Sequence, residues 1–516
     1  ADGMTRRPSR GAVLAVVGGL LVALSLPPWG FWPLAFVGVA VFETALGESP
    51  TVRQRATRGW LFGAGWLALG MCWMWFLTAP GYLIATALFA GFHAVAAVAA
   101  PTGSWRVWGR PAAHTLAEAL RFCFPFGGVP LASLAIGQAG GPFASVVRIG
   151  GVLLLTWFVF QVGFALAGPS PFVPAMVRKQ RPDARPEWHG AIALLLALVM
   201  LPLSAAASNA RTTGVRHIAI VQGGGPQGTH AVHSDPSIVF QRHLTASHQV
   251  KAGSVDMVLW PENVINVPTF AGSAEFAAVA AEAKRVGAPF VVGITEDATD
   301  PAHFVNAQVV VAPDGQLTSR YEKVRRVPFG EYMPMRGFLH ALGAPTDLVP
   351  RDAVAGHTPA VLELPDTTRI AVAISWEIFF GGRAHEGVEH GGALLVNPTN
   401  GSSYTWTVLQ SQQIAASRLR AVEQNRWVVQ ASPTGFSAFI APSADVHSRT
   451  AVSEQRVIEH EVESTPLVRT VYSNTGDLPW VGSMILLLGA SVLLERRRRH
   501  AVAGSTADSV TPRSSP

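Results

Sequence analysis

The feature that most constrains this chain is a series of apolar stretches about as long as a lipid bilayer is thick. Seven stretches precede residue 210 and one lies near the C-terminal end: 11–27, 32–47, 60–78, 82–100, 112–134, 149–168, 191–207 and 480–494. A membrane-spanning helix needs about 20 predominantly apolar residues. With a mean hydropathy of +0.30 and only 14% charged residues, these stretches predict a multi-span α-helical membrane domain rather than buried helices of a soluble protein.

Basic residues occur in alternate linkers between these stretches. They cluster at 6–10, 53–58, 106–110, 178–185 and 496–499, whereas the linkers 27–30 and 79–81 carry none. Because cytoplasmic loops are enriched in Lys and Arg, we expect both termini to be cytoplasmic and the region between the last two spans to be extracytoplasmic. The net charge of +6 is therefore explained by membrane topology, and no nucleic-acid partner is expected.

These patterns divide the chain into five predicted parts. Residues 1–10 form a cytoplasmic N-terminus, in which the three residues before Met4 are expected to be a cloning remnant. The other parts are a membrane domain of about seven spans, an extracytoplasmic domain, a final transmembrane helix and a basic, disordered cytoplasmic tail: 11–210, 211–477, 478–495 and 496–516.

Residues 211–477 alternate between strand-like and helix-like patterns. Strands are expected at 217–222, 256–260, 289–295, 306–312, 369–374 and 393–396, followed by 427–430, 437–441 and 457–462. Helices are expected at 237–251, 273–286, 378–390 and 407–423. Repeated strand and helix within one domain predict a layered α/β architecture.

The two cysteines restrict the chemistry of this domain. Cys72 and Cys123 both lie in the apolar half, so the region 211–477 can contain neither an internal disulfide nor a cysteine nucleophile. Its histidines are scattered without the spacing of a metal site. No metal and no other cofactor is therefore expected.

Polar residues follow two of the expected strands or hairpins. Pro261 ends the strand 256–260 and leaves Glu262 beyond its end. Lys323 and Glu331 stand on either side of a turn that contains Val-Pro-Phe-Gly. Each could be an ordinary surface charge, and only their combination suggests a site.

A third polar stretch, Ser375, Trp376 and Glu377, follows the apolar strand 369–374. An α/β fold places its chemistry at the C-terminal ends of strands, so Ser375 is a candidate nucleophile. It is equally a candidate N-cap of the next helix, with Glu377 in the first turn.

Taken together, the three stretches resemble the Glu, Lys and Cys triad of the nitrilase superfamily. Glu262 lies in Trp-Pro-Glu, Lys323 precedes Val-Pro-Phe-Gly-Glu-Tyr-Met-Pro, and Ser375 stands where the superfamily has its cysteine. With apolar spans on both sides, the chain resembles the bacterial apolipoprotein N-acyltransferases within this superfamily. The resemblance covers nearly the whole chain and implies a nitrilase-like αββα sandwich for the extracytoplasmic domain.

The resemblance implies acyl transfer in two steps at the bacterial inner or plasma membrane. A phospholipid would donate an acyl chain to residue 375, and the acyl-enzyme would pass it to the α-amino group of a diacylglyceryl-cysteine lipoprotein. The partners are thus a phospholipid donor, a lipidated acceptor and the membrane. The enzyme is expected to be a monomer.

The resemblance also implies a role for each polar residue. Glu262 would act as the general base. Lys323 and the backbone N–H of Trp376 would face the oxyanion of the tetrahedral intermediate. Glu331 and Glu377 would orient Lys323 and balance its charge.

Ser375 is the main departure from the family pattern. A thiol has a reference pKa of about 8.5 and is within reach of a carboxylate base, whereas an alcohol is far less acidic. Impaired activity is therefore expected. Ser375 is either an engineered replacement or natural in a divergent paralogue that acylates another acceptor; a non-catalytic lipid or lipoprotein binding protein is a further alternative. The loops 223–225 and 397–401 also differ from the family pattern, which favours divergence.

Overall fold

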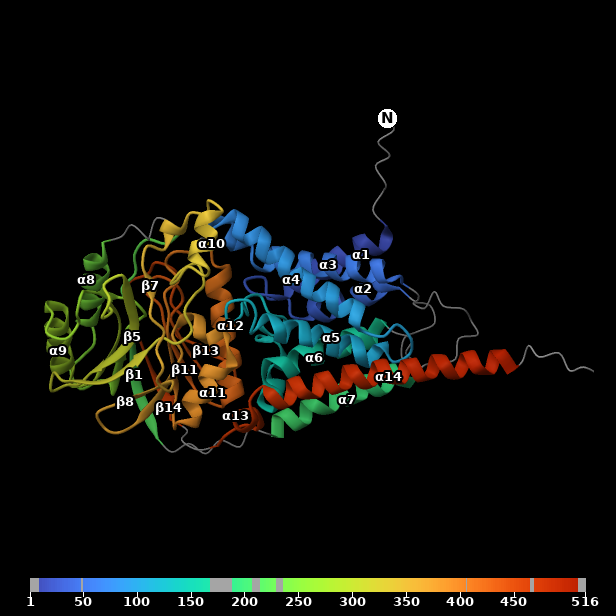
Figure 1. The fold of residues 1–516 in the computed structure, drawn as a ribbon. Coiled ribbons are helices and arrows are strands. Elements are labelled where there is room, and N and C mark those ends of the chain that lie inside the picture. Colours follow the sequence, from blue (N-terminus) through green and yellow to red (C-terminus); the bar gives the residue numbers. More distant parts are fainter. Residues whose placement is uncertain are drawn as a thin grey trace, which may run out of the picture.

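The computed structural model describes residues 9–47, 50–167, 188–206, 214–228, 235–404, 406–464 and 468–508. Within these ranges, a helical bundle lies beside an α/β domain, and the last helix returns along the bundle (Figure 1). The predicted combination of an apolar helical region and an α/β sandwich is confirmed. The predicted remnant before Met4, the basic linker 178–185 and the tail beyond residue 508 lie outside the described residues.

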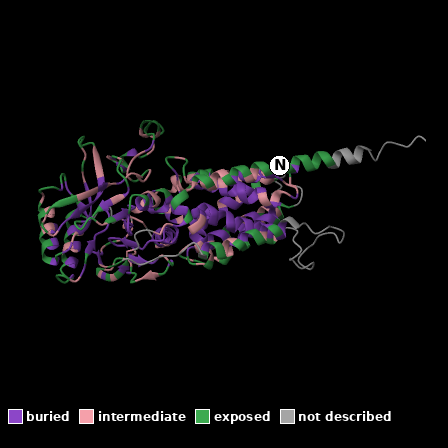
Figure 2. Cartoon of the chain, turned by 90° about the horizontal axis from the view of Figure 1, so that it is seen from below, coloured by how far each residue is buried: buried purple, intermediate pink, exposed green. Residues whose placement is uncertain are grey.

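The bundle contains seven helices from the first part of the described chain and the long helix near its C-terminal end. They are α1 (Arg10–Ser25), α2 (Pro33–Leu46), α3 (Val52–Gly70), α4 (Ala79–Ala99), α5 (Arg106–Arg121), α6 (Val147–Ala167), α7 (Trp188–Ala206) and α14 (Leu478–Asp508). Short 3-10 helices cover Cys72–Phe76, Leu134–Gln138 and Pro142–Val146. The side chains between these helices are largely buried (Figure 2).

Two bundle helices differ from the expected spans. The stretch 60–78 belongs to a helix that begins earlier, because the Thr51 side chain caps α3 and Gln54 completes the capping box. The stretch 112–134 is helical only as far as Arg121. The Arg121 guanidinium donates to the carbonyl oxygens of Val129 and Leu131, at 2.7 and 2.5 Å, so the chain after α5 folds back on the helix end.

Among the described residues, three helices are long and apolar enough to cross a membrane by length and composition: Ala79–Ala99, Pro142–Ala167 and Leu478–Ala501. Three shorter helices are also apolar: Arg10–Ser25, Pro33–Leu46 and Gly190–Ala205. The count of eight spans therefore stays a prediction.

Several basic linkers meet at one end of the bundle. Arg55 at the start of α3 donates to the carbonyl of Ala100 beyond α4, at 2.9 Å. Arg106 at the start of α5 pairs with Glu43 near the end of α2, at 3.2 Å. Arg499 bonds Thr102 at 2.5 Å, where α14 extends away from the α/β domain (Figure 1). These basic residues therefore lie at one end of the bundle, and its cytoplasmic placement stays a prediction.

Two sheets form the α/β domain. The first has the order β14-β1-β2-β4-β5-β6, with β3 beside β4 and β7 beside β5. Its strands are β1 (Val215–Gln222), β2 (Met257–Leu259), β3 (Ile265–Asn266), β4 (Phe290–Asp297), β5 (His303–Val311), β6 (Leu317–Glu322), β7 (Asp352–Ala353) and β14 (Arg456–Glu463). The strands β1, β2 and β4 are parallel.

The second sheet has the order β13-β12-β11-β10-β9-β8. Its strands are β8 (Val361–Glu363), β9 (Arg369–Val372), β10 (Leu395–Pro398), β11 (Val428–Ala431), β12 (Ala438–Ile440) and β13 (Val446–His447). The strands β9, β10 and β11 are parallel. The remaining helices are α8 (Pro236–Ser247), α9 (Ala274–Val286), α10 (Arg336–Ala341), α11 (Gly381–Glu389), α12 (Val408–Gln424) and α13 (Val471–Thr475).

The two sheets face each other between two helical layers. Ile220 and Leu259 of the first sheet share a buried apolar cluster with Ile370 and Val372 of the second. The helices α8 and α9 cover the outer face of the first sheet, and α11 and α12 cover the second (Figure 1). This is the αββα order that the sequence predicts.

Helix α12 lies between the second sheet and the bundle, which explains why it is buried along most of its length. The Gln412 side chain donates to the carbonyl of Gly70 at 2.8 Å and accepts from the N–H of Ala132 at 3.1 Å. Buried polar groups need such partners. The bundle is therefore joined to the α/β domain by specific hydrogen bonds as well as by apolar contact.

Candidate active site

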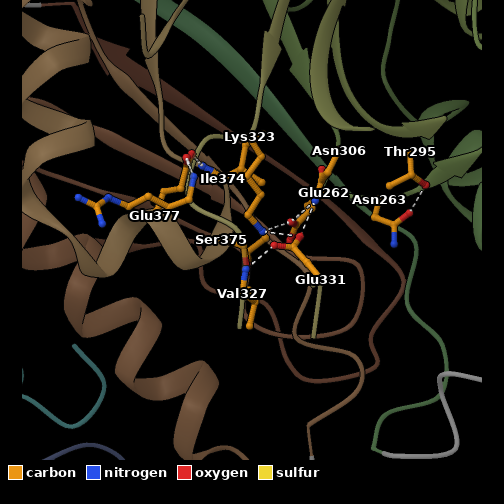
Figure 3. A network of polar contacts seen from close by, with 12 residues as sticks. Glu262, Asn263, Thr295, Asn306, Lys323, Val327, Glu331, Ile374, Ser375 and Glu377 are labelled. Carbon is orange, nitrogen blue, oxygen red and sulfur yellow. Dashed lines mark hydrogen bonds and ion pairs between the residues drawn. The ribbon is translucent and has the colours of Figure 1, made fainter. Parts of the chain in front are cut away.

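A buried ammonium group lies between two carboxylates where strands of the first sheet end. Lys323 directly follows β6 and is 2% exposed, and Glu262 lies three residues beyond β2 and is 4% exposed. The Lys323 Nζ atom is 2.8 Å from an oxygen of Glu262 and 2.8 Å from an oxygen of Glu331 (Figure 3). These three predicted site residues are thus in direct contact.

Asn306, which no sequence motif marked, completes this cluster. Its side-chain amide donates to Glu262 at 2.8 Å and to Glu331 at 2.9 Å. Asn306 lies within β5, where asparagine is uncommon because its side chain does not suit a pleated sheet. An asparagine in the predicted strand 306–312 was therefore the one sequence signal that could have marked Asn306 as a site residue.

Burial and the charges of this cluster shift the pKa values of Lys323 and Glu262. Burial opposes the charge of Lys323, but Glu262 and Glu331 outweigh it and raise the pKa of this ammonium group. Burial raises the pKa of Glu262, against the attraction of Lys323, and the charge of Glu331 adds to the rise. The Glu262 carboxylate is therefore a stronger base than an exposed glutamate.

Glu377 contacts backbone groups rather than Lys323. Its carboxylate accepts from the N–H groups of Val324 and Arg325 at 3.0 and 2.9 Å, and from the N–H of Ile374 at 2.9 Å. The hydroxyl of Tyr321 donates to both of its oxygens. This carboxylate joins the chain after Lys323 to the chain before Ser375. The expected role of Glu377 in orienting Lys323 stays a prediction.

Ser375 begins a 3-10 helix, Ser375–Phe379, rather than ending the strand. The expected strand 369–374 stops at Val372, because the N–H of Ile374 bonds Glu377 instead of the next strand. The helix expected at 378–390 begins only at α11. The Ser375 backbone has a φ of 51°, which costs a residue with a Cβ about 1–3 kcal/mol.

The Ser375 side chain does not cap a helix. Thr399 donates to its hydroxyl oxygen at 3.1 Å, and Ile374 rather than the serine is the N-cap residue of the 3-10 helix. Thr399 follows β10 and is held by its N–H bond to Ala431 at 2.8 Å. The cap interpretation is therefore wrong, and Ser375 is presented at the ends of parallel strands near the Lys323 segment (Figure 3).

Aromatic side chains surround this cluster. The Trp376 ring packs against Phe380, with centroids 5.9 Å apart. Tyr404, which the sequence analysis did not identify, packs edge-on against Trp73 of the bundle at 4.9 Å. Burial raises the pKa of Tyr404 to about 12, against the charge of Lys323, which lowers it. The bundle thus contributes to the wall of the site.

The site contains three functional groups: a hydroxyl, a buried carboxylate with a raised pKa, and an ammonium group held in place. A carboxylate of this kind can take a proton from a nucleophile, and a fixed cation can stabilise an oxyanion. The arrangement suits nucleophilic attack on a carbonyl carbon. Among the described residues, no group of three or more His, Cys, Asp and Glu side chains is placed to hold a metal ion.

Two family profiles match this chain. The profile described as "Apolipoprotein N-acyltransferase N-terminal domain" matches residues 18–165, which include most of the bundle. The profile described as "Carbon-nitrogen hydrolase" matches residues 217–468, which include the candidate site.

Individual proteins are similar over nearly the whole chain. The apolipoprotein N-acyltransferase of Mycolicibacterium smegmatis is 30% identical over 512 residues, covering 93% of this chain and 84% of that protein. The apolipoprotein N-acyltransferase of Azotobacter vinelandii is 29% identical over 527 residues, covering 96% of this chain and 98% of that protein. Among solved structures, Saccharomyces cerevisiae Nit3, a member of the nitrilase superfamily, matches 53% of this chain and 97% of its own, with 15% identity and a TM-score of 0.38.

Proposed function

Because this chain belongs to the apolipoprotein N-acyltransferase family, we propose that it transfers an acyl chain from a phospholipid to the α-amino group of a diacylglyceryl-cysteine lipoprotein. The observation that best supports the proposal is the contact of Lys323 with Glu262 and Glu331 beside the Ser375 segment. Burying the Lys323 ammonium group and the Glu262 carboxylate costs desolvation free energy, so their presence favours a chemical role over binding alone.

In the first half-reaction, the Ser375 hydroxyl oxygen attacks the ester carbonyl carbon of the phospholipid, and Glu262 takes the hydroxyl proton. Lys323 and the backbone N–H of Trp376 stabilise the oxyanion, since the first N–H groups of a helix lack partners within it. The intermediate then expels the lysophospholipid oxygen, which receives the proton from Glu262. The product is an acyl ester on Ser375.

In the second half-reaction, the α-amino group of the acceptor attacks this ester carbonyl. Glu262 takes a proton from the attacking amine, and the amide forms as the Ser375 oxygen leaves and is reprotonated by Glu262. The Ser375 proton thus leaves on the lysophospholipid, a proton of the amine restores the Ser375 hydroxyl, and Glu262 ends ionised, so no further reactant is needed. Glu331 and Asn306 hold Lys323 and Glu262 in place, and Glu377 sets the distance between the Lys323 and Ser375 segments.

Ser375 makes the first half-reaction slow, because Glu262 is a weak base for an alcohol. We expect labelled lysophospholipid to be released from labelled phospholipid, and a diacylglyceryl peptide to become N-acylated. The variant Ser375→Cys should increase both rates by about tenfold or more. Intact-protein mass spectrometry should show the acyl adduct on residue 375, and Ser375→Ala is the matched control. Absence of any gain in Ser375→Cys would contradict the assignment of Ser375 as the nucleophile.

A second candidate function is lipid or lipoprotein binding without turnover. The observation that favours it is the Ser375 hydroxyl, which is bonded to Thr399 rather than to Glu262. This function predicts a stable phospholipid complex and no lysophospholipid. Release of lysophospholipid that Ser375→Ala abolishes would exclude it.

The proposal extends to the placement of the protein. Residues 11–210 and 478–495 form the membrane part of a multi-pass protein of the bacterial inner or plasma membrane, and 211–477 lie on the extracytoplasmic side. Residues 1–10 and 496–516 are cytoplasmic. The convergence of Arg55, Arg106 and Arg499 at the bundle end remote from the α/β domain supports this orientation. We propose that the protein acts as a monomer.

A further inference from the structure

A pocket of about 490 Å³ opens beside the candidate active site. Its walls come from the loop after α5, the chain that follows Lys323, and the start of α11, and they include Phe126, Arg325, Arg326, Trp376 and Glu386. Trp376 belongs to both this pocket and the site, because it follows Ser375 directly. A molecule in the pocket therefore contacts the residue that follows the proposed nucleophile.

Two arginines give the pocket its charge. Neither Arg325 nor Arg326 forms an ion pair with any residue that the structure describes, whereas the neighbouring Arg320 pairs with Glu296 at 2.7 Å. Glu386, the carboxylate of the pocket, is already paired with Arg383. The lining side chains of the pocket therefore carry a net positive charge, and the carboxylates of Glu377 and Asp477 attract Arg325 without pairing with it.

The two guanidinium groups are held in place with donors to spare. Arg325 lies 4.2 Å from the ring centroid of Phe380 and donates to the carbonyl of Gly127 at 3.1 Å. Arg326 lies 4.4 Å from the ring centroid of Tyr332 and donates to a carbonyl at 2.7 Å. A guanidinium has five N–H donors, so each retains donors for a ligand. Fixed arginines that take part in no ion pair suit a phosphate group.

We propose that Arg325 and Arg326 bind the phosphate of the phospholipid acyl donor and so select the donor in the first half-reaction. This inference rests on the proposed function, which makes a phospholipid the donor. The phosphate and the reacting ester belong to the same glycerol unit, so a phosphate beside Trp376 leaves the ester carbonyl within reach of Ser375. The acceptor, a diacylglyceryl cysteine, has no phosphate and gains nothing from these arginines.

The test measures binding in Ser375→Ala, which prevents turnover. Dihexanoylphosphatidylethanolamine and dihexanoylglycerol carry the same acyl chains and differ in the phosphate headgroup. We expect Arg325→Gln and Arg326→Gln each to weaken binding of the phospholipid by about tenfold, since a charge-assisted hydrogen bond is lost. Binding of dihexanoylglycerol should not change, and Arg325→Lys should bind the phospholipid more tightly than Arg325→Gln.

Arg351→Gln is the matched control, because Arg351 is a partly exposed arginine outside the pocket, paired with Asp297 at 2.6 Å. It should leave both lipids unaffected. Equal losses for the two lipids, or no loss for the phospholipid, would overturn the proposal. Inorganic phosphate should displace the phospholipid much less effectively than glycerophosphoethanolamine; equal displacement would assign the pocket to free anions instead.

These outcomes are separable from those of the proposed function. Binding is measured without acyl transfer, so a headgroup preference can be found even if Ser375 is never acylated. Conversely, acylation of Ser375 without any headgroup preference would sustain the proposed function and overturn this inference. Dihexanoylglycerol binding also serves as the test of folding in every variant.

Discussion

At the scale of single residues, the proton affinity of Glu262 sets the pH at which the site can work. Glu262 must be ionised to accept a proton, and burial raises its pKa. We therefore predict that lysophospholipid release rises with pH through this raised pKa and is lost as the pH falls below it. Glu262→Gln should reduce the rate by about 100-fold or more at every pH. The measurement is the initial rate from about pH 4 to about pH 9.

Asn306 offers the matched variant for this prediction. It donates to Glu262 at 2.8 Å, and Asn306→Asp replaces that donor with a further negative charge. A nearby like charge raises the pKa of a carboxyl group. The midpoint of the pH profile should then move to higher pH. An unchanged midpoint in Asn306→Asp would show that the profile reports another group.

At the scale of secondary-structure elements, Glu377 connects the ends of two sheets. Its carboxylate accepts three backbone N–H groups and the Tyr321 hydroxyl. Glu377→Gln replaces one acceptor oxygen with an N–H₂ group that cannot accept, so buried donors lose their partner. We predict a loss of about 2–3 kcal/mol in the free energy of unfolding and a fall in acyl transfer. Thermal unfolding and lysophospholipid release are the measurements.

Glu363→Gln is the control for this variant, because Glu363 is an exposed glutamate that pairs with Arg369 at 3.3 Å. An exposed pair contributes less than about 1 kcal/mol. Equal effects of Glu363→Gln and Glu377→Gln would contradict the connecting role of Glu377.

Most helices and strands could be predicted from the sequence, because the spacing of apolar residues and the position of turn residues determine them locally. The strands 217–222 and 427–430 correspond closely to β1 and β11. Strand β6 was missed because most of its side chains are polar or exposed at the sheet edge. The contacts of Glu377 could not be predicted, because they depend on how one sheet packs against the other. Glu262, Lys323 and Glu331 are in contact, although β4 and β5 lie between the strands that Glu262 and Lys323 follow. Their catalytic roles stay a prediction.

At the scale of the whole molecule, Glu423 lies buried where α12, α13 and the bundle meet. Its carboxylate pairs with Arg420 at 2.7 Å, yet burial and the charge of Asp477 raise its pKa to about 8 from 4.5. Because the pKa of Glu423 is higher in the folded state than in the unfolded state, protonation of Glu423 favours folding. This contribution is complete below about pH 4.5 and is lost as the pH rises to about 8.

We therefore predict that the unfolding temperature falls between about pH 5 and about pH 8, and that Glu423→Gln flattens this slope. A single group contributes about 1.4 kcal/mol per pH unit within that window. The slope is the measured quantity, because Glu423→Gln also leaves Arg420 without its partner and lowers stability at every pH. Parallel slopes for the two proteins would assign the pH dependence to other groups.

The orientation of the whole molecule can be tested with thiol labelling, because Cys72 and Cys123 are the only cysteines in the chain. In a background with both replaced by alanine, Ala252→Cys places a thiol on an exposed loop of the α/β domain, and His500→Cys places one near the end of α14. The basic linkers converge on the α14 end, so we expect positive charge to retain that end in the cytoplasm. A membrane-impermeant maleimide should label Ala252→Cys in intact spheroplasts and His500→Cys only after lysis. The reverse pattern would place the candidate site in the cytoplasm, where it would face a different pool of acceptors.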